Sequence, residues 1–181
     1  MSSRILITIL VLFTSEVKAQ KYPYTAQADI SLLVGRNVLP VPGVQIFNGV
    51  QVEKWSAETG ITVGTDVYTQ FTLLPVSACL KWMPFPQKIL MPYLSFTAGY
   101  GLTWLNKATE EKRYLGGSVF NPSVGLRIKT KTKTRVNFGV GFKQQRATIV
   151  ETGFDDLGST VSVFTEKYKL GRVSLNIGAV F

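Results

Sequence analysis

Lys169-Leu-Gly-Arg-Val-Ser-Leu-Asn-Ile-Gly-Ala-Val-Phe181, the carboxy-terminal stretch of the chain, alternates strictly between an apolar face and a mostly polar or small face. The apolar face consists of Val173, Leu175, Ile177, Ala179 and Phe181. Because side chains of a β-strand point alternately to opposite sides, this period of two predicts a strand between two unlike media. An open terminal strand would leave backbone groups unpaired, whereas a closed barrel pairs it with the first strand. The stretch therefore favours a barrel.

The same alternation recurs along most of the chain after Gln20. It predicts eight strands, at about residues 24–36, 43–54, 58–68, 71–82, 94–104, 119–128, 135–150 and 161–181. Residues 37–42 and 106–113 are expected to form loops. Each apolar face holds about four to six residues in line, which matches an apolar band about 25 Å tall. The sequence thus predicts an all-β fold, an eight-stranded antiparallel up-and-down transmembrane β-barrel.

The beginning of the chain has the three parts of a secretory signal peptide. Arg4 supplies a positive charge, and residues 5–13 form an apolar run too short to span a bilayer as a helix. Val17-Lys-Ala19 matches the site read by signal peptidase. We therefore expect residues 1–19 to be removed on export and residues 20–181 to form the barrel domain.

Residue composition argues against catalysis. The chain contains no histidine, which removes the usual general base of hydrolytic and metal-dependent sites. Its single cysteine, Cys79, cannot form an internal disulfide and is interpreted as a packing residue. We expect no enzymatic activity, no cofactor and no metal. The formal net charge of +9 is spread over strands and turns, so lipid phosphates are favoured over nucleic acid as the counter-charge.

The two faces of the predicted barrel carry different candidate residues. Aromatic side chains at strand ends on the side of both termini are expected at a membrane interface: Tyr24, Trp55, Trp82, Tyr93 and Phe181. Charged side chains on the inward face are expected to form an ion-paired network: Asp29, Glu53, Asp66, Lys81, Arg127, Arg135, Lys143 and Arg172. Because an eight-stranded barrel is only wide enough to be filled by side chains, we expect a closed interior. An ion or proton path along these charges is the alternative interpretation.

Over its whole mature length the chain resembles the small eight-stranded outer-membrane barrels of Gram-negative bacteria, the OmpA/OmpX type. The residues that carry the resemblance are the signal ending at Ala19, the Pro92-Tyr-Leu-Ser-Phe-Thr-Ala-Gly-Tyr-Gly101 and Asn121-Pro-Ser-Val-Gly-Leu-Arg127 stretches, and the terminal Phe181. Mature Gln20 and the second stretch are similar to the Bacteroidota branch. The resemblance implies outer-membrane localisation and insertion by the barrel-assembly machinery. In the family this machinery reads the last strand, matched here by Leu175, Ile177, Val180 and Phe181.

The chain departs from a regular barrel at Pro75 and Pro122, which lie inside predicted strands and suggest bulges there. The leading hypothesis is a structural or cell-surface interaction barrel. A secreted lipocalin-like barrel, with apolar faces turned inward around a small apolar ligand, has the same period and is the alternative. Residues 144–169 keep alternating after the outward face stops being apolar. They therefore predict a projecting hairpin that an extracellular protein partner could bind.

Overall fold

The structure, a computed structural model, describes residues 23–181 except 37, 104–105, 107–111, 132–133 and 155–159. The predicted signal peptide and its cleavage site lie outside the described residues. The strands are β1 (Tyr24–Gly35), β2 (Val38–Val52), β3 (Ala57–Val67), β4 (Thr72–Trp82), β5 (Leu90–Leu102), β6 (Lys112–Leu115), β7 (Gly117–Lys129), β8 (Arg135–Phe154) and β9 (Thr160–Val180). The 3-10 turn η2 (Glu53–Trp55) connects β2 to β3.

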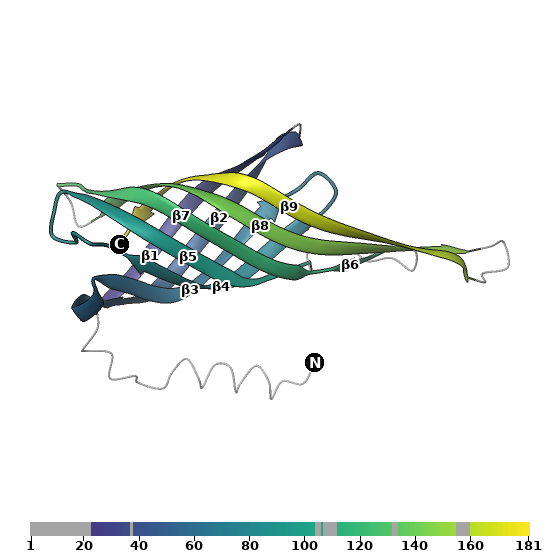
Figure 1. Cartoon of the computed structure of the whole chain (residues 1–181), viewed down its shortest axis with the longest axis horizontal. Helices are drawn as coiled ribbons and strands as arrows, with labels where there is room; N and C mark the ends of the chain where they lie inside the picture. The colour runs from purple at the N-terminus through teal and green to yellow at the C-terminus, as the bar shows by residue number, and fades with distance from the viewer. Residues whose placement is uncertain (1–22, 37, 104–105, 107–111, 132–133, 155–159) are drawn as a thin grey trace, which may run out of the picture.

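Antiparallel pairing in the order β1-β2-β3-β4-β5-β7-β8-β9, with β9 pairing back to β1, closes the sheet into a barrel (Figure 1). The first strand, β1, pairs with the last, β9, from Gln27↔Val180 to Val34↔Val173. At the end of this seam the Phe181 amide donates to the Ala26 carbonyl at 2.8 Å. Because β6 and β7 are two parts of one strand separated at Gly116, the barrel has eight strands, and the predicted fold is confirmed.

The residues that alternate along each strand point alternately to the inside and to the outside of the barrel. On β1, for example, Ile30 is 65% exposed on the outer face, whereas the neighbouring Ser31 is 2% exposed on the inner face. The outer face of the barrel wall is formed mainly by Val, Leu, Ile and Phe side chains, and the inner face holds most of the buried polar and charged ones. Within the described part of the chain no helix is long and apolar enough to cross a bilayer.

Two predicted loops are partly strand. The predicted loop at residues 37–42 is wrong, because β2 already begins at Val38 and pairs with the end of β1 through Leu33↔Val41. The predicted loop at residues 106–113 overlaps β6, whose residues pair with β8 from Lys112↔Glu151 to Leu115↔Thr148. In both places hydrogen bonding to the neighbouring strand extends the sheet into residues whose own sequence is polar or rich in proline.

Pro75 and Pro122, the prolines at which bulges are predicted, do not mark bulges. Pairing is interrupted near Pro75 between β3 and β4 and near Pro122 between β7 and β8, but the register is the same on both sides of each gap. The predicted bulges are therefore wrong, because the missing N–H removes a ladder bond without inserting an extra residue. Register shifts occur instead between Leu33 and Gly35 and between Gly153 and Phe154.

A β-sheet extension projects from one end of the barrel (Figure 1). It consists of the ends of β8 and β9, paired from Arg146↔Lys169 to Phe154↔Thr160, together with β6 along the other edge of β8. We call these residues the extension. The predicted continuation of the two strands beyond the apolar band is confirmed, whereas the third strand, β6, was not predicted.

Candidate functional site

The interior of the barrel is built around a buried ion pair between Arg127 of β7 and Glu58 of β3. Both side chains are fully buried, and the guanidinium binds the carboxylate through two contacts, Nη1–Oε1 at 2.6 Å and Nη2–Oε2 at 2.9 Å. Paired hydrogen bonds of this kind give both attraction and a defined orientation. The pair therefore joins opposite sides of the barrel wall at the end nearest the termini.

A second cation, Lys81 of β4, extends this network toward β1. Its ammonium donates to Gln27 Oε1 at 2.5 Å and lies 3.6 Å from Glu58 Oε2. Gln27 in turn donates to Asp29 Oδ2 at 2.5 Å. Lys81 also lies over the Phe47 ring, 4.6 Å from its centroid, which adds a cation–π contact. Charges from four strands, β1, β3, β4 and β7, are thus compensated inside one buried cluster.

A separate cluster lies nearer the extension and is centred on Asp66 of β3. Asp66 Oδ2 accepts hydrogen bonds from Lys143 Nζ at 2.6 Å and from Gln145 Nε2 at 2.7 Å. Tyr68 donates from its hydroxyl to the Gln145 side chain. A Cβ atom on Gly43 would lie 2.7 Å from Asp66 Oδ1, so the carboxylate occupies space that only glycine leaves free. The second cluster therefore ties β3 to β8.

Apolar packing fills the barrel beyond this second cluster. The buried residues there are Leu33, Val41, Tyr68, Phe71, Leu73, Ala147 and Ile149. Arg172 borders this packing, with its guanidinium 5.1 Å from the Tyr68 ring centroid and Nη1 donating to the Leu39 carbonyl at 2.8 Å. Between the apolar packing and the ion pair nearest the termini, the interior void is only about 30 Å³. Such a void has room for at most a few water molecules, so the described interior is packed.

The structure places most of the predicted interior residues inside the barrel. Those that are buried are Asp29, Asp66, Lys81, Arg127, Lys143 and Arg172, and Arg135 is half-buried. Glu53 is exposed in the turn η2, so its predicted inward position is wrong: the strand ends at Val52, and the turn breaks the alternation. Glu58, which was not predicted, supplies the carboxylate instead. Glu58 is an even number of positions from Thr62 and Asp66 on β3, so it shares their inward face. This spacing is the sequence signal that could have predicted its position.

The structure exposes all but one of the predicted interface aromatics. Tyr24, Trp55, Trp82 and Phe181 are exposed at strand ends on the side of the termini. Tyr93 is buried, and its hydroxyl accepts from Asn137 Nδ2 at 3.1 Å, so its assignment to the interface is wrong.

Tyr93 points inward because the adjacent Leu94 points outward. Its ring fits because it faces Gly125, where an added Cβ atom would lie 2.4 Å from the ring. Of the predicted assembly residues, Leu175, Ile177 and Phe181 lie on the outer face, and Val180 is buried on the inner face. Their role in insertion stays a prediction.

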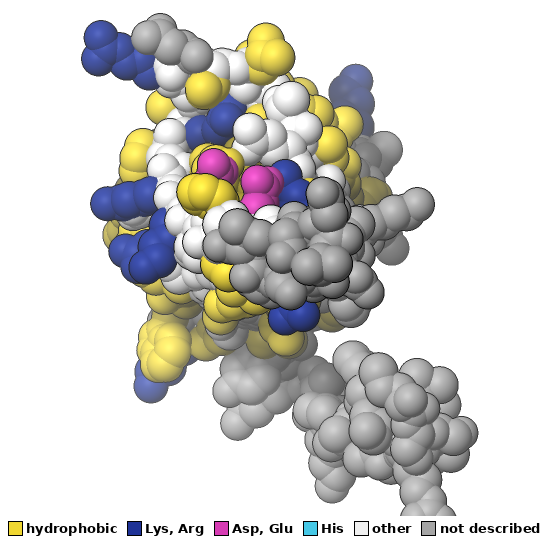
Figure 2. Space-filling view, turned by 90° about the vertical axis from the view of Figure 1, so that its right-hand side faces the viewer, with side chains coloured by type: hydrophobic (Ala, Val, Ile, Leu, Met, Phe, Trp, Pro, Cys, Tyr) yellow, Lys and Arg dark blue, Asp and Glu magenta, His cyan; other side chains and the backbone are white. Residues whose placement is uncertain are grey.

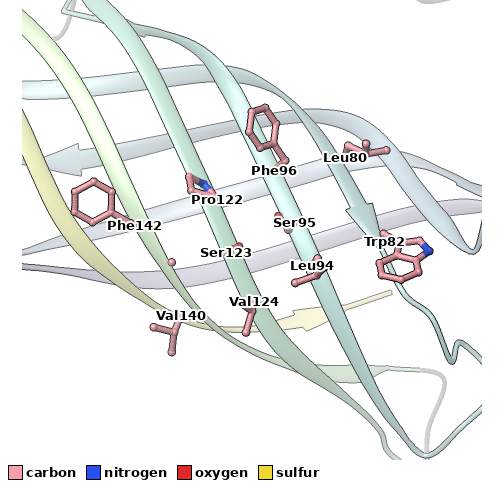
Figure 3. Close-up of a pocket in the computed structure, with 11 residues that line it drawn as sticks. Leu80, Trp82, Leu94, Ser95, Phe96, Pro122, Ser123, Val124, Val140 and Phe142 are labelled. Carbon is pink, nitrogen blue, oxygen red and sulfur yellow. The ribbon is translucent and has the colours of Figure 1, made fainter.

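The outer face of β4, β5, β7 and β8 is a broad apolar surface with a shallow depression of about 610 Å³ (Figure 3). Leu80, Leu94, Phe96, Val124 and Phe142 project from the strands around it, and Pro122 also lines it. Phe96 also packs edge-on against Phe120, with ring centroids 4.7 Å apart. The outer face thus gathers many exposed large apolar side chains, an arrangement that soluble monomers rarely show.

An apolar outer belt around a charged, packed interior defines the class of small outer-membrane β-barrels, and the chain has their fold. The chain is similar to the outer membrane protein AlkL, whose structure was determined in DMPC lipid bilayers (TM-score 0.55, 13% identity, 87% of this chain and 88% of that one). It is also similar to OprG of Pseudomonas aeruginosa (0.57, 8%, 87% and 93%) and to the amino-terminal barrel of OprF from the same species (0.51, 13%, 88% and 99%). No protein-family model and no curated protein matches the sequence.

The lipocalin-like alternative requires the opposite arrangement of faces. In a carrier of that kind the apolar side chains would surround an internal cavity large enough for a ligand. Here they lie outside, and the void between the buried charges is too small for a drug-sized molecule. The alternative interpretation is therefore wrong for the described part of the chain.

Proposed function

We propose that this protein is an integral outer-membrane barrel that acts without catalysis, as a structural or cell-surface interaction protein. The observation that carries the proposal is the continuous apolar belt outside an ion-paired, packed interior. A membrane supplies the apolar medium that such a belt requires, and a closed barrel satisfies every strand edge within it. The lack of histidine in the sequence supports the non-catalytic part of the proposal.

Membrane fractionation tests the proposed location. The mature protein should remain in the membrane pellet after carbonate extraction, and unheated samples should migrate differently from heated ones on a gel, because a closed barrel resists unfolding by detergent. Mass spectrometry of the same material should show Gln20 as the first residue. Recovery of folded protein in the soluble periplasmic or secreted fraction would contradict the proposal.

Conductance tests the proposed role of the interior. Purified monomer in planar bilayers should give at most small, irregular currents, since the interior is bridged by the Arg127–Glu58 and Lys143–Asp66 ion pairs. An established porin measured in the same bilayers serves as the positive control. Stable steps of porin size from the monomer would show that the interior opens and that the protein acts as a channel.

The extension is the part of the molecule we propose for an extracellular protein partner. The edge of β9 from Ser162 to Gly171 faces away from β8, and β1 pairs with β9 only as far as Val173. A strand edge with free backbone groups can bind an extended segment of another protein by β-addition. The edge of β8, in contrast, is partly covered by β6.

Deletion of the outer half of the extension tests this role. Ala147 and Ile149 are buried in the apolar packing of the barrel, so the cut must lie beyond them. Removing residues 151–164 and joining Val150 to Thr165, which are cross-strand partners, by a short glycine-containing turn should leave heat-modifiable migration unchanged. Any cell-surface or protein binding by the intact molecule should be lost. Unchanged binding, or failure of the shortened barrel to assemble, would contradict this role.

A further inference from the structure

The membrane-proximal part of the extension has two faces of different charge. Its outer face continues the lipid-facing side of the barrel, because the alternation of β8 is unbroken from Phe142 to Val150. Four exposed cations lie on this face: Arg113, Arg146, Lys167 and Lys169. We call them the cationic cluster. Among the described residues of the extension, no acidic side chain lies on this face.

The described acidic side chains of the extension lie on its opposite face and have local partners. Glu151 binds Lys112 at 2.6 Å, and this hydrogen bond raises the pKa of the Lys112 ammonium. Glu166 accepts a hydrogen bond from the Tyr168 hydroxyl, which raises the pKa of Tyr168. Neither carboxylate is therefore placed to neutralise the cationic cluster on the other side of the sheet.

Two members of the cationic cluster are direct cross-strand neighbours. Arg146 of β8 pairs with Lys169 of β9, and Lys167 follows on the same face, opposite Thr148. Like charges directly opposite each other destabilise a sheet. An anion bound between Arg146 and Lys169 would replace this repulsion with two attractive contacts, and a guanidinium can bind a phosphate through two parallel hydrogen bonds. The pair is thus arranged for an anionic ligand.

The height of the cluster above the apolar belt indicates which anion it meets. The last apolar cross-strand pair on this face is Phe142↔Val173, followed by Gln144↔Gly171 and then Arg146↔Lys169. At the rise and tilt of membrane strands, four residues correspond to about 10 Å of height. The headgroup layers of a bilayer begin directly outside its ~30 Å hydrocarbon core. The cluster therefore lies at the level of the lipid phosphates.

We propose that the cationic cluster binds the phosphate groups of an anionic glycolipid in the outer leaflet of the membrane. The inference rests on the proposed membrane location. Figure 2, which views the molecule from the end that carries the extension, shows several Lys and Arg side chains at the periphery, whereas the visible Asp and Glu side chains gather near the middle. A soluble acidic partner would have to enter the headgroup layer to reach Arg146 and Lys169, so a lipid is the favoured ligand.

The experiment measures binding of lipid A with two phosphates to the full mature chain folded in zwitterionic micelles. The test variant is Arg146→Gln with Lys169→Gln. The control is Lys54→Gln with Lys131→Gln, which removes the same charge from exposed positions at the opposite end of the barrel. Each cation near an anionic surface contributes about fivefold in affinity, so the test variant should bind about 25-fold more weakly. The control should bind within about twofold of wild type by the same reasoning.

A stability measurement separates a binding role from a structural one. Without lipid A the test variant should unfold at the same or higher urea concentration than wild type, because a like-charge pair has been removed. With lipid A only wild type and the control should gain stability, since a ligand stabilises the state that it binds. Equal loss of stability with and without lipid A would show that Arg146 and Lys169 act structurally and would overturn the proposal.

Further outcomes of the binding experiment would show which part of the proposal is wrong. Equal affinity for dephosphorylated lipid A, or unchanged binding by the test variant, would overturn phosphate recognition. Displacement by millimolar inorganic phosphate alone would assign the site to free phosphate, and stronger binding of a polyglutamate peptide would assign it to an acidic protein. A chain that enters micelles but shows no phosphate dependence refutes only the lipid site, whereas one that enters neither micelles nor vesicles refutes the membrane location as well.

Discussion

Replacement of Glu58 by Ala is expected to lower the free energy of unfolding by about 3–5 kcal/mol, the largest effect of any single substitution considered. Arg127 would keep its charge in a fully buried position after losing both carboxylate contacts, and Lys81 would lose its nearest anion. An uncompensated buried charge is far more costly than the ion pair is stabilising. Urea titration of the barrel in lipid vesicles, followed by tryptophan fluorescence, measures the change.

Two further variants make this result specific. Glu53→Ala removes the same charge from an exposed turn five positions earlier and should change stability by less than about 0.5 kcal/mol. The double replacement of Glu58 and Arg127 by Met should recover most of the loss, because apolar residues of similar volume can replace a buried ion pair at little cost. If Glu58→Ala is as stable as Glu53→Ala, the ion pair does not hold the interior together.

Arginine in place of Leu126 should cost about 2–4 kcal/mol in a bilayer, as for cations near the midplane on the lipid face of a barrel. Leu126 lies on the outer face of β7, with Phe138 beside it on β8. A guanidinium at this position would have to leave water for hydrocarbon. Unfolding in vesicles of a phospholipid with an intermediate acyl chain measures the cost.

The matched control places the same charge on the same side of the sheet but beyond the apolar belt. Val163→Arg, at an exposed position of the extension, should change stability by about 0–1 kcal/mol, because the side chain stays in water. The difference in unfolding free energy between Leu126→Arg and Val163→Arg should depend on the lipid, because only the first variant places its charge in hydrocarbon. If both variants have equal stability in vesicles, the outer face of β7 does not contact hydrocarbon.

Most of the architecture was predictable because a strand gives each residue only two directions. Once Ile30 and Val124 are assigned to the outside, the positions of Asp29 and Arg127 follow from parity alone. The same parity rule places Tyr93 inside. Its predicted position at the membrane interface is wrong because that prediction follows from residue type and not from parity. The glycines opposite the ring, Gly125 and Gly139, are the features that make room for an inward tyrosine.

Parity does not predict which inward side chains contact one another. The Arg127–Glu58 contact joins residues 69 positions apart on strands that are not neighbours in the sheet, so it depends on tilt and stagger around the whole barrel. Glu53 was misplaced because η2 and the left-handed Ser56 (φ 49°) end the alternation within a few residues. The strand β6 was missed because its pairing depends on the length of β8 and not on its own sequence pattern.

The unequal lengths of the two pairings made by β9 have a consequence for the order of folding. Its pairing with β8 runs from Arg135↔Val180 to Phe154↔Thr160 and joins segments adjacent in the chain, whereas its pairing with β1 is shorter and joins the two ends of the domain. Contacts between distant segments require a larger loss of chain entropy and form more slowly. We therefore expect the β8–β9 hairpin to form early and the seam at Ala26 and Phe181 to close last. Until then, the edges of both terminal strands would remain unpaired and open to pairing with another strand.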